Sequence, residues 1–285
     1  YDKNSYPEID GRLMNVNWKD LEVAPDVWVW DSLYNELVDK TLNGLPIIIL
    51  IYTRDGAPDW IYDYGVPKVF ESTNNVVTGF SPYYKGTEYK FYFNRMITRV
   101  RDYIATLPSN LRNHVVGIQG CFGSTGDYIA YKGTVDPAYS ISPDGFDSLF
   151  HEFSLSMYGA YQNTNPKITL LSNPGNNGST EINWLNQNCP GGWIKTGSLG
   201  KGYQFNDETD KSAWLFPLLN NTQGNGEYIR ARSEIIGDAL SAGWWTKAKY
   251  KNMFSLLSYC IHWGVDWSNQ RNDFITDAYF DSTFS

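Results

Sequence analysis

The chain has 285 residues, 42% of them hydrophobic, which is enough for one large domain with a sizeable core. Its net charge of −8 argues against nucleic acid or an anionic membrane surface as a partner. The longest apolar run, 45–52, is too short to cross a bilayer, so no membrane span is expected.

Strand-like and helix-like patterns alternate from the start of the chain. The segment 12–18 predicts a strand. A helix is expected from about Asp26 to Gly44, with one apolar face formed by Trp30, Leu33, Leu37, Val38 and Leu42. The continuous apolar run 45–53 predicts a strand that is buried on both faces. The loop 54–86 contains a weaker strand, in either KVFES (68–72) or VVTGF (76–80).

The middle of the chain continues this alternation. A helix is predicted by apolar residues at helical spacing: Tyr89, Phe93, Met96, Val100, Tyr103 and Leu107. A short strand follows at 115–120. The next helix has a clear start at Ser142-Pro143-Asp144, where a capping residue precedes a proline in the first turn. The segment 166–173 predicts another strand.

The last part of the chain predicts three more strands, at 192–199, 228–234 and 264–270. Helices are expected near 180–188, 208–219 and 250–261. The final segment, 276–285, begins a helix that a barrel would continue. We therefore expect the last helix to be incomplete and the native chain to be longer.

Eight strands that alternate with helices predict an α/β fold, a (β/α)8 TIM barrel that forms one domain over residues 1–285. An open doubly wound sheet is the alternative. It is less favoured because no Gly-x-Gly-x-x-Gly motif follows the first strand.

Two carboxylates follow strands at positions where barrels carry their active sites. Asp127 comes after the strand 115–120, in the Gly-rich segment GCFGSTGD, and Glu234 closes the strand 228–234. A pair of carboxylates is the minimum equipment for cleaving a glycosidic bond. The histidines and cysteines show no metal-binding spacing, so no metal and no cofactor are expected.

Two segments carry a resemblance to a known family. The segment NVNWKDLEVAPDVWVWDSLYNELV (15–38) resembles the first β/α unit of clan A glycoside hydrolases, especially the β-galactosidase- and agarase-like members. The segment IYTRDGAPDWIYDYGVP (51–67) resembles their second strand and the Pro-Asp-Trp loop after it. The resemblance implies a nucleophile at the end of the seventh strand, Glu234, and an acid/base after the fourth, Asp127. The family usually has Asn-Glu at the latter position, where this chain has Gly-Ser-Thr-Gly-Asp.

Substrate-binding residues are expected at the same strand ends and in the loops beside them. Aromatic rings stack on sugar faces, amides bond to hydroxyl groups, and cations contact an anionic substrate. The expected residues are Trp18, Trp60, Trp263 and Trp267 for stacking, Asn17, Gln119, Asn269 and Gln270 for hydrogen bonding, and Tyr131, Arg54 and Lys132 in loops. At each position, packing within the core is the alternative.

The predicted function is that of a retaining glycoside hydrolase that cleaves β-glycosidic bonds of an extracellular oligo- or polysaccharide. The resemblance suggests a β-galactan. A secreted, periplasmic or cell-surface protein is expected because the sequence begins at Tyr1 without Met, which a removed secretion signal would explain. One alternative is a carbohydrate-binding barrel without catalysis, which the missing Asn-Glu pair favours. Another is a lyase or isomerase on the same fold, for which Lys195, within the sixth predicted strand, is the candidate for a Schiff base.

Overall fold

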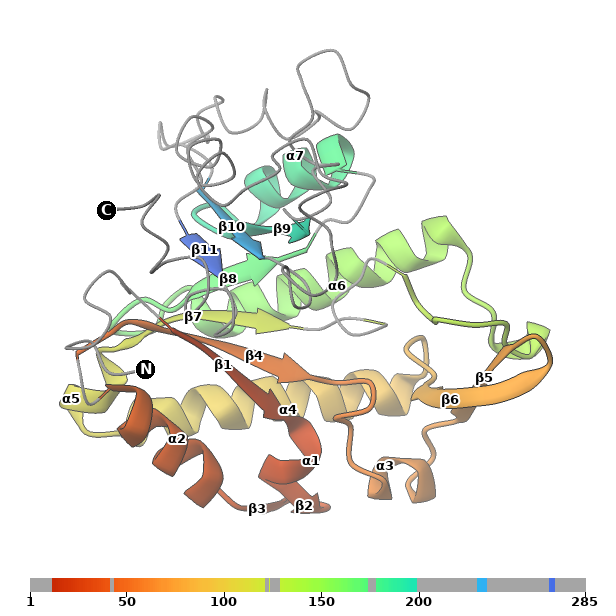
Figure 1. Ribbon diagram of the computed structural model, residues 1–285, viewed down its shortest axis with the longest axis horizontal. Helices are drawn as coiled ribbons and strands as arrows, with labels where there is room; N and C mark the ends of the chain where they lie inside the picture. The colour runs from red at the N-terminus through yellow and green to blue at the C-terminus, as the bar shows by residue number, and fades with distance from the viewer. Residues whose placement is uncertain are drawn as a thin grey trace, which may run out of the picture. The chain divides into compact units, whose positions relative to one another are not determined.

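The computed structural model describes residues 12–41, 44–120, 123, 129–173, 178–198, 230–234 and 267–269. The chain divides into two compact units, Tyr1–Leu171 and Ser172–Ser285 (Figure 1). Parallel strands and helices occur in both units, so the fold class is α/β, as the sequence predicts.

The N-terminal unit is built on parallel strands that the sequence analysis places correctly. Their order is β1 (Arg12–Asn17), β4 (Ile47–Tyr52), β7 (Val115–Gly120) and β8 (Thr169–Ser172). Residues 47–51 of β4 are all buried, as expected for a central strand covered on both faces. Parallel pairing brings the carboxyl ends of these strands to the same edge of the sheet.

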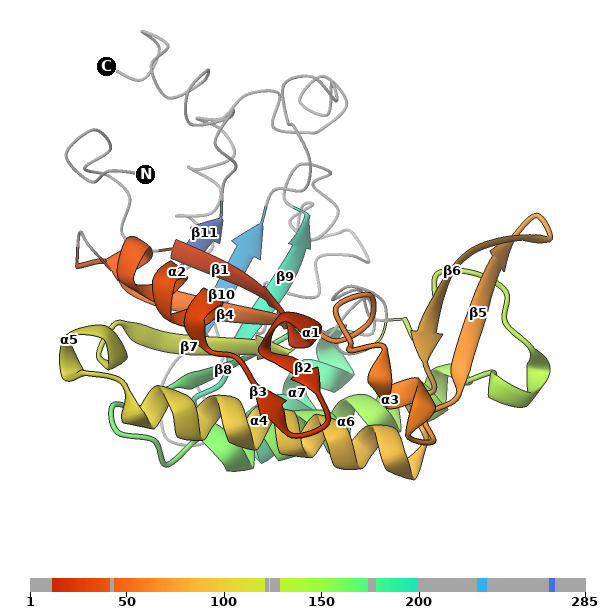
Figure 2. The ribbon, with the colours of Figure 1, turned by 90° about the horizontal axis from the view of Figure 1, so that it is seen from below.

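Two long helices lie side by side against this sheet, α4 (Thr87–Thr106) and α6 (Pro143–Tyr161) (Figures 1 and 2). The predicted start of α6 is confirmed, because the Ser142 hydroxyl accepts a bond from the Gly145 N–H at 3.2 Å and Pro143 occupies the first turn. Between the helices, the rings of Phe93 and Phe153 pack with their centroids 4.7 Å apart.

The helix expected from Asp26 begins later than predicted. Helix α2 spans Asp31–Thr41, and a small antiparallel hairpin precedes it, made of β2 (Glu22–Ala24) and β3 (Val27–Trp28). Asp26 lies at the turn of this hairpin with a φ of 58°, a left-handed conformation that cannot continue a helix. The short helix α1 (Trp18–Leu21) links β1 to the hairpin.

The strand expected in the loop 54–86 is two strands, and neither belongs to the parallel sheet. Strands β5 (Lys68–Thr73) and β6 (Val76–Pro82) pair antiparallel, and β4 pairs directly with β7. Asn74 and Asn75 both have positive φ, the requirement of a two-residue turn that joins such strands. Figure 2 shows this hairpin standing apart from the parallel strands. The prediction of a third barrel strand here is therefore wrong.

Shorter helical segments connect these elements. Helix α3 (Trp60–Asp63) precedes the β5–β6 hairpin, and α5 (Ser109–Arg112) leads into β7. A single 3-10 turn, Pro137–Tyr139, precedes α6, and the Asp136 side chain caps it by accepting a bond from the Ala138 N–H. None of the helices in the described part of the chain is long and apolar enough to span a bilayer.

The C-terminal unit contains α7 (Gly178–Asn188) and three parallel strands. These are β9 (Trp193–Ser198), β10 (Arg230–Glu234) and β11 (Trp267–Asn269), with β10 between the other two. All four elements were predicted. The helices expected at 208–219, 250–261 and 276–285 lie outside the described residues.

We expect the α4–α6 contact to carry much of the stability of the N-terminal unit. Phe153→Ala should lower the free energy of unfolding by about 3–5 kcal/mol, because a buried ring is lost and its cavity cannot fully collapse. Urea denaturation measures this change. Leu155→Ala is the control on the same helix. Its side chain is 45% exposed, so an effect within about 0.5 kcal/mol is expected, and equal losses in the two variants would contradict the assigned packing.

Candidate functional site

Polar residues lie at the carboxyl edge of the N-terminal sheet, where barrel enzymes carry their sites. Asn17 ends β1 opposite Tyr52, and its amide donates a hydrogen bond to the Asp20 carboxylate at 2.7 Å. Gln119 lies near the end of β7, beside Leu50 on one side and Leu171 on the other. Only 2% of Gln119 is exposed. Asn17, which is half-buried, is thus the more accessible of these two predicted residues.

The C-terminal unit brings three polar residues to one strand edge. Glu234 is the last residue of β10, and it lies in register with Asn269 of β11 and Ser198 of β9. Trp267 begins β11, two residues before this edge. Lys195 lies in the interior of β9, opposite Arg232, and not at a strand end. Glu234, and not Lys195, is therefore the residue that lies at the end of a strand.

Trp18 is fully buried, which corrects its expected role as a stacking surface. Its indole N–H donates to the Glu22 carboxylate at 2.9 Å, and Glu22 is itself fully buried. The Glu22 carboxylate also accepts a bond from the Asp26 N–H at 2.9 Å and forms an ion pair with Arg95. Trp18 is part of a structural cluster and presents no ring face to a ligand.

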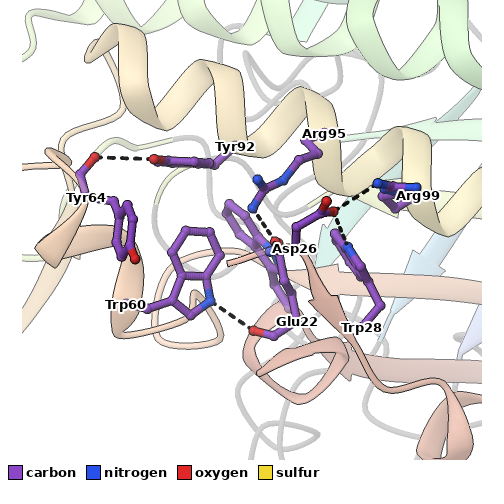
Figure 3. Close-up of polar contacts among 9 residues, drawn as sticks. Glu22, Asp26, Trp28, Trp60, Tyr64, Tyr92, Arg95 and Arg99 are labelled. Carbon is purple, nitrogen blue, oxygen red and sulfur yellow. Dashed lines mark hydrogen bonds and ion pairs between the residues drawn. The ribbon is translucent and has the colours of Figure 1, made fainter. Parts of the chain in front are cut away.

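Trp60 belongs to the same cluster (Figure 3). Its indole N–H donates to the main-chain oxygen of Glu22 at 3.0 Å, and its ring meets Tyr92 edge-on with centroids 5.1 Å apart. The Arg95 guanidinium lies over the Trp60 ring at 5.4 Å, a cation–π contact. Trp60 stays half-buried, so part of the ring remains accessible.

Further along α4, Arg99 forms a second ion pair in this cluster, with Asp26. Arg99 donates to the Asp26 carboxylate at 2.9 Å, and Asp26 also accepts a bond from the Trp28 indole at 3.1 Å (Figure 3). Both charged side chains are about half exposed, so this pair contributes little to stability. It ties the turn of the β2–β3 hairpin to α4.

Arg54 lies directly beyond β4, and its partner is a second buried carboxylate. Its guanidinium donates from Nε to Glu71 Oε1 at 3.1 Å and from Nη2 to Glu71 Oε2 at 2.9 Å. Glu71 is fully buried, whereas 14% of the Arg54 side chain is exposed. The predicted contact between Arg54 and an anionic substrate is not supported, because its charge is already matched.

The two buried glutamates differ in the direction of their pKa shifts. At Glu22, removal from water raises the pKa, and the bonds from Trp18, Asp26 and Arg95 offset only part of this effect. At Glu71, removal from water acts in the same direction, but the bonds from Arg54, Ser81 and Lys132 outweigh it and lower the pKa. Glu71 is therefore held as an anion.

Tyr131 and Lys132 lie in the loop that follows β7. The Tyr131 hydroxyl is buried, and within the described part of the chain no hydrogen-bond partner reaches it. Burial raises its pKa, so it stays protonated. The Lys132 side chain is exposed, while its N–H donates to the Glu71 carboxylate at 2.8 Å.

Three of the predicted residues, Asp127, Trp263 and Gln270, lie outside the described residues. Among the residues that the structure describes, no group of three or more His, Cys, Asp or Glu side chains is arranged so that it could hold a metal ion. The sequence analysis missed Glu22 and Glu71 as members of buried clusters. A signal existed for Glu71, because it alternates with Val69 on the buried face of β5.

No family model and no curated protein sequence matches the chain. Solved structures do. The β-galactosidase from Rahnella sp. R3 matches with a TM-score of 0.55 and 13% identity, over 90% of this chain and 45% of that chain. The catalytic domain of the β-amylase from Paenibacillus polymyxa matches with a TM-score of 0.54 and 10% identity, over 95% of this chain and 86% of that chain. The β-galactosidase from the psychrophilic Marinomonas ef1 matches with a TM-score of 0.51 and 15% identity, over 78% of this chain and 44% of that chain.

These structures all belong to glycosidases, as the resemblance in the sequence implied, and the suspected relation is confirmed at the level of the fold. The chain spans less than half the length of the two β-galactosidases.

The buried role of Trp18 is testable by a conservative change. Trp18→Phe removes the indole donor and leaves the buried Glu22 carboxylate short of one bond, which should lower the free energy of unfolding by about 1–3 kcal/mol. Chemical denaturation measures the loss. Trp28→Phe is the control, because its indole bonds to the exposed Asp26, and a change within about 0.5 kcal/mol is expected. A Trp18→Phe protein of unchanged stability would refute the structural role.

Proposed function

We propose that the chain is a retaining glycoside hydrolase, with Glu234 as the nucleophile and Asp127 as the acid/base. The observation that carries the proposal is the position of Glu234, the last residue of a parallel strand, in a chain whose fold is similar to that of solved glycosidases. Asn269 and Ser198 in the same register supply polar neighbours of the kind that a sugar-binding edge needs.

Retaining hydrolysis requires two carboxyl groups about 5–5.5 Å apart. The Glu234 carboxylate attacks the anomeric carbon while the glycosidic C–O bond breaks, and Asp127 donates its proton to the leaving oxygen. A water molecule then attacks the same carbon, gives its proton to Asp127 and releases Glu234. Each step inverts the anomeric carbon, so the product retains the configuration of the substrate.

The order of the strands supports this assignment. With the β5–β6 hairpin outside the parallel sheet, β7 and β10 are still separated by β8 and β9 in chain order. The same number of strands separates the fourth and seventh strands of a barrel, after which the resemblance implies the two catalytic groups, although β7 is the third and β10 the sixth of the parallel strands described. We propose that both units belong to one (β/α)8 barrel over residues 1–285.

We propose a β-linked oligo- or polysaccharide, such as a β-galactan, as the substrate. Two of the similar structures are named as β-galactosidases. In the N-terminal unit, Asn17 ends β1, and Trp60 and Lys132 lie in the segments that follow β4 and β7; Asn17 and Trp60 are half-buried and Lys132 is exposed. Trp263, Trp267, Asn269 and Gln270 are proposed to bind sugar from the C-terminal unit. A polymeric substrate of this kind is met outside the cell, so we propose a secreted, periplasmic or cell-surface location.

A second function is favoured by one observation. The segment after β7 reads Gly-Cys-Phe-Gly-Ser-Thr-Gly-Asp and lacks the Asn-Glu pair that the resemblance implies there. A barrel that lost its acid/base would bind sugars without cleaving them.

Substitution of the two carboxylates separates these functions. On a panel of β-linked polysaccharides and aryl glycosides, Asp127→Asn should lower kcat about 100- to 10,000-fold, and Glu234→Gln at least as much. Added azide should restore turnover of an activated aryl glycoside by Asp127→Asn, because azide needs no base to attack the glycosyl-enzyme. Nuclear magnetic resonance of the first product anomer tests retention.

Asp63→Asn serves as the control, since Asp63 is an exposed carboxylate on α3 and should leave kcat unchanged. Sugar binding without turnover by the unmodified protein would favour the binding barrel. Turnover that survives Glu234→Gln would remove the proposed nucleophile.

A further inference from the structure

We infer that Glu71 is a positioning residue, which fixes the far end of the loop after β7 to the β5–β6 hairpin, while Tyr84, just after β6, holds its near end. The loop is described at Gly123 and from Ile129 onward, and residue 127 within it is the proposed acid/base. The inference rests on the proposed function for its catalytic consequence, but the attachment of the loop stands on contacts of its own.

The attachment begins at the parallel sheet. Arg54 comes two residues after the end of β4 and binds Glu71 on β5 through two parallel N–H···O bonds. The Ser81 hydroxyl of β6 donates to Glu71 Oε1 and accepts a bond from Arg54 Nε at 3.0 Å. One buried anion thus joins the sheet edge to both strands of the hairpin.

The hairpin in turn holds the far end of the loop. The Lys132 N–H donates to Glu71 Oε2 at 2.8 Å, so the same carboxylate binds the loop directly. Ser72 and Thr134 exchange two main-chain hydrogen bonds of 2.8 Å each, which adds a short antiparallel bridge. Gly133 is needed for this approach, because a Cβ there would lie 2.7 Å from the Ser72 carbonyl oxygen.

The near end of the loop is held from the residues just after β6. The hydroxyl of Tyr84, which is fully buried, donates to the Gly123 carbonyl oxygen at 3.1 Å. Gly123 has a φ of 69°, and a Cβ there would lie 2.4 Å from the Ile129 carbonyl oxygen. Gly123 and Ile129 therefore lie against each other. The Tyr84 ring also stacks on Tyr131, with centroids 5.7 Å apart.

The negative charge of Glu71 is essential to this arrangement. Its two oxygens accept bonds from Arg54, Ser81 and the Lys132 N–H, and all of these groups are donors. An amide offers one oxygen and one NH2 group, so a glutamine would turn donors toward Arg54 or toward Lys132. Removing one partner of a buried ion pair also leaves the other charge uncompensated.

Hydrogen–deuterium exchange of the full chain, read by mass spectrometry, tests the attachment without activity. Glu71→Gln should speed exchange of amides in peptides covering 129–134 by about tenfold or more, while peptides from β1 and α4 stay unchanged. Glu152→Gln is the matched control. It removes the carboxylate of an exposed ion pair with Lys90 and should leave the loop unchanged. Unaltered loop exchange in Glu71→Gln would overturn the inference.

Kinetics test the catalytic consequence on the same samples. Glu71→Gln should lower kcat by about 10- to 100-fold with little change in KM, because a displaced acid/base impairs chemistry more than binding. Faster loop exchange with unchanged kcat would overturn the positioning role. If the unmodified protein has no turnover at all, the proposed function fails, and exchange alone decides whether Glu71 fixes the loop.

A second variant covers the case in which Glu71→Gln does not fold. Ser81→Ala removes the hydroxyl that bridges Arg54 and Glu71 but keeps the charge pair. It should speed loop exchange in the same peptides by a smaller factor and leave the fold intact. A Ser81→Ala protein with the loop exchange of the unmodified chain would contradict the bridging contact.

Discussion

Two fully buried carboxylates determine how the two hairpins of the N-terminal unit are attached to the rest of that unit. Glu22 and Glu71 must be paired inside the protein, because an isolated charge removed from water costs several kcal/mol. Glu22 takes its partners from α4 and from the turn of the β2–β3 hairpin. Glu71 takes its partners from the end of β4, from β6 and from the loop after β7. Each carboxylate therefore joins segments that are distant in sequence. The β2–β3 hairpin with Glu22 and the β5–β6 hairpin with Glu71 can each take only the position in which the carboxylate meets its arginine.

Apolar packing alone would not impose this restriction. The rings of α4 and α6 supply a large area of contact, but a hydrophobic contact tolerates small shifts in direction. A carboxylate that is bound by a bidentate arginine and a backbone N–H does not tolerate such shifts, because hydrogen bonds weaken steeply as their angles depart from linear. Stability and placement thus come from different parts of the unit, with stability from the helices and placement from the buried ion pairs.

The sequence predicts the long elements because their signals are local. The apolar spacing of α4, the Ser142-Pro143 start of α6 and the apolar run of β4 each lie within one segment. The two hairpins were missed because they depend on backbone conformation at single residues, namely a positive φ at Asp26, Asn74 and Asn75. The Arg54–Glu71 pair was missed because it joins residues on either side of a loop, and charge alone does not reveal a partner. For the candidate site, the pattern placed Glu234 correctly at a strand end but misjudged Trp18, whose burial depends on its tertiary contact with Glu22.

Neither of the two buried glutamates can serve as an acid/base. A general acid needs a raised pKa together with access to the leaving oxygen. Glu71 does not have a raised pKa, because its partners hold it as an anion, and it has no access to a leaving oxygen, because it is fully buried. Glu22 has the raised pKa, but it lies beneath Trp18 and Trp60 with no exposed surface. Both are structural carboxylates, and neither can serve as the proton donor of the proposed mechanism. The loop after β7 has one described end bonded to Glu71 of the β5–β6 hairpin and the other to Tyr84 just after it, and such attachment is what a carboxylate carried by a loop requires for a defined position.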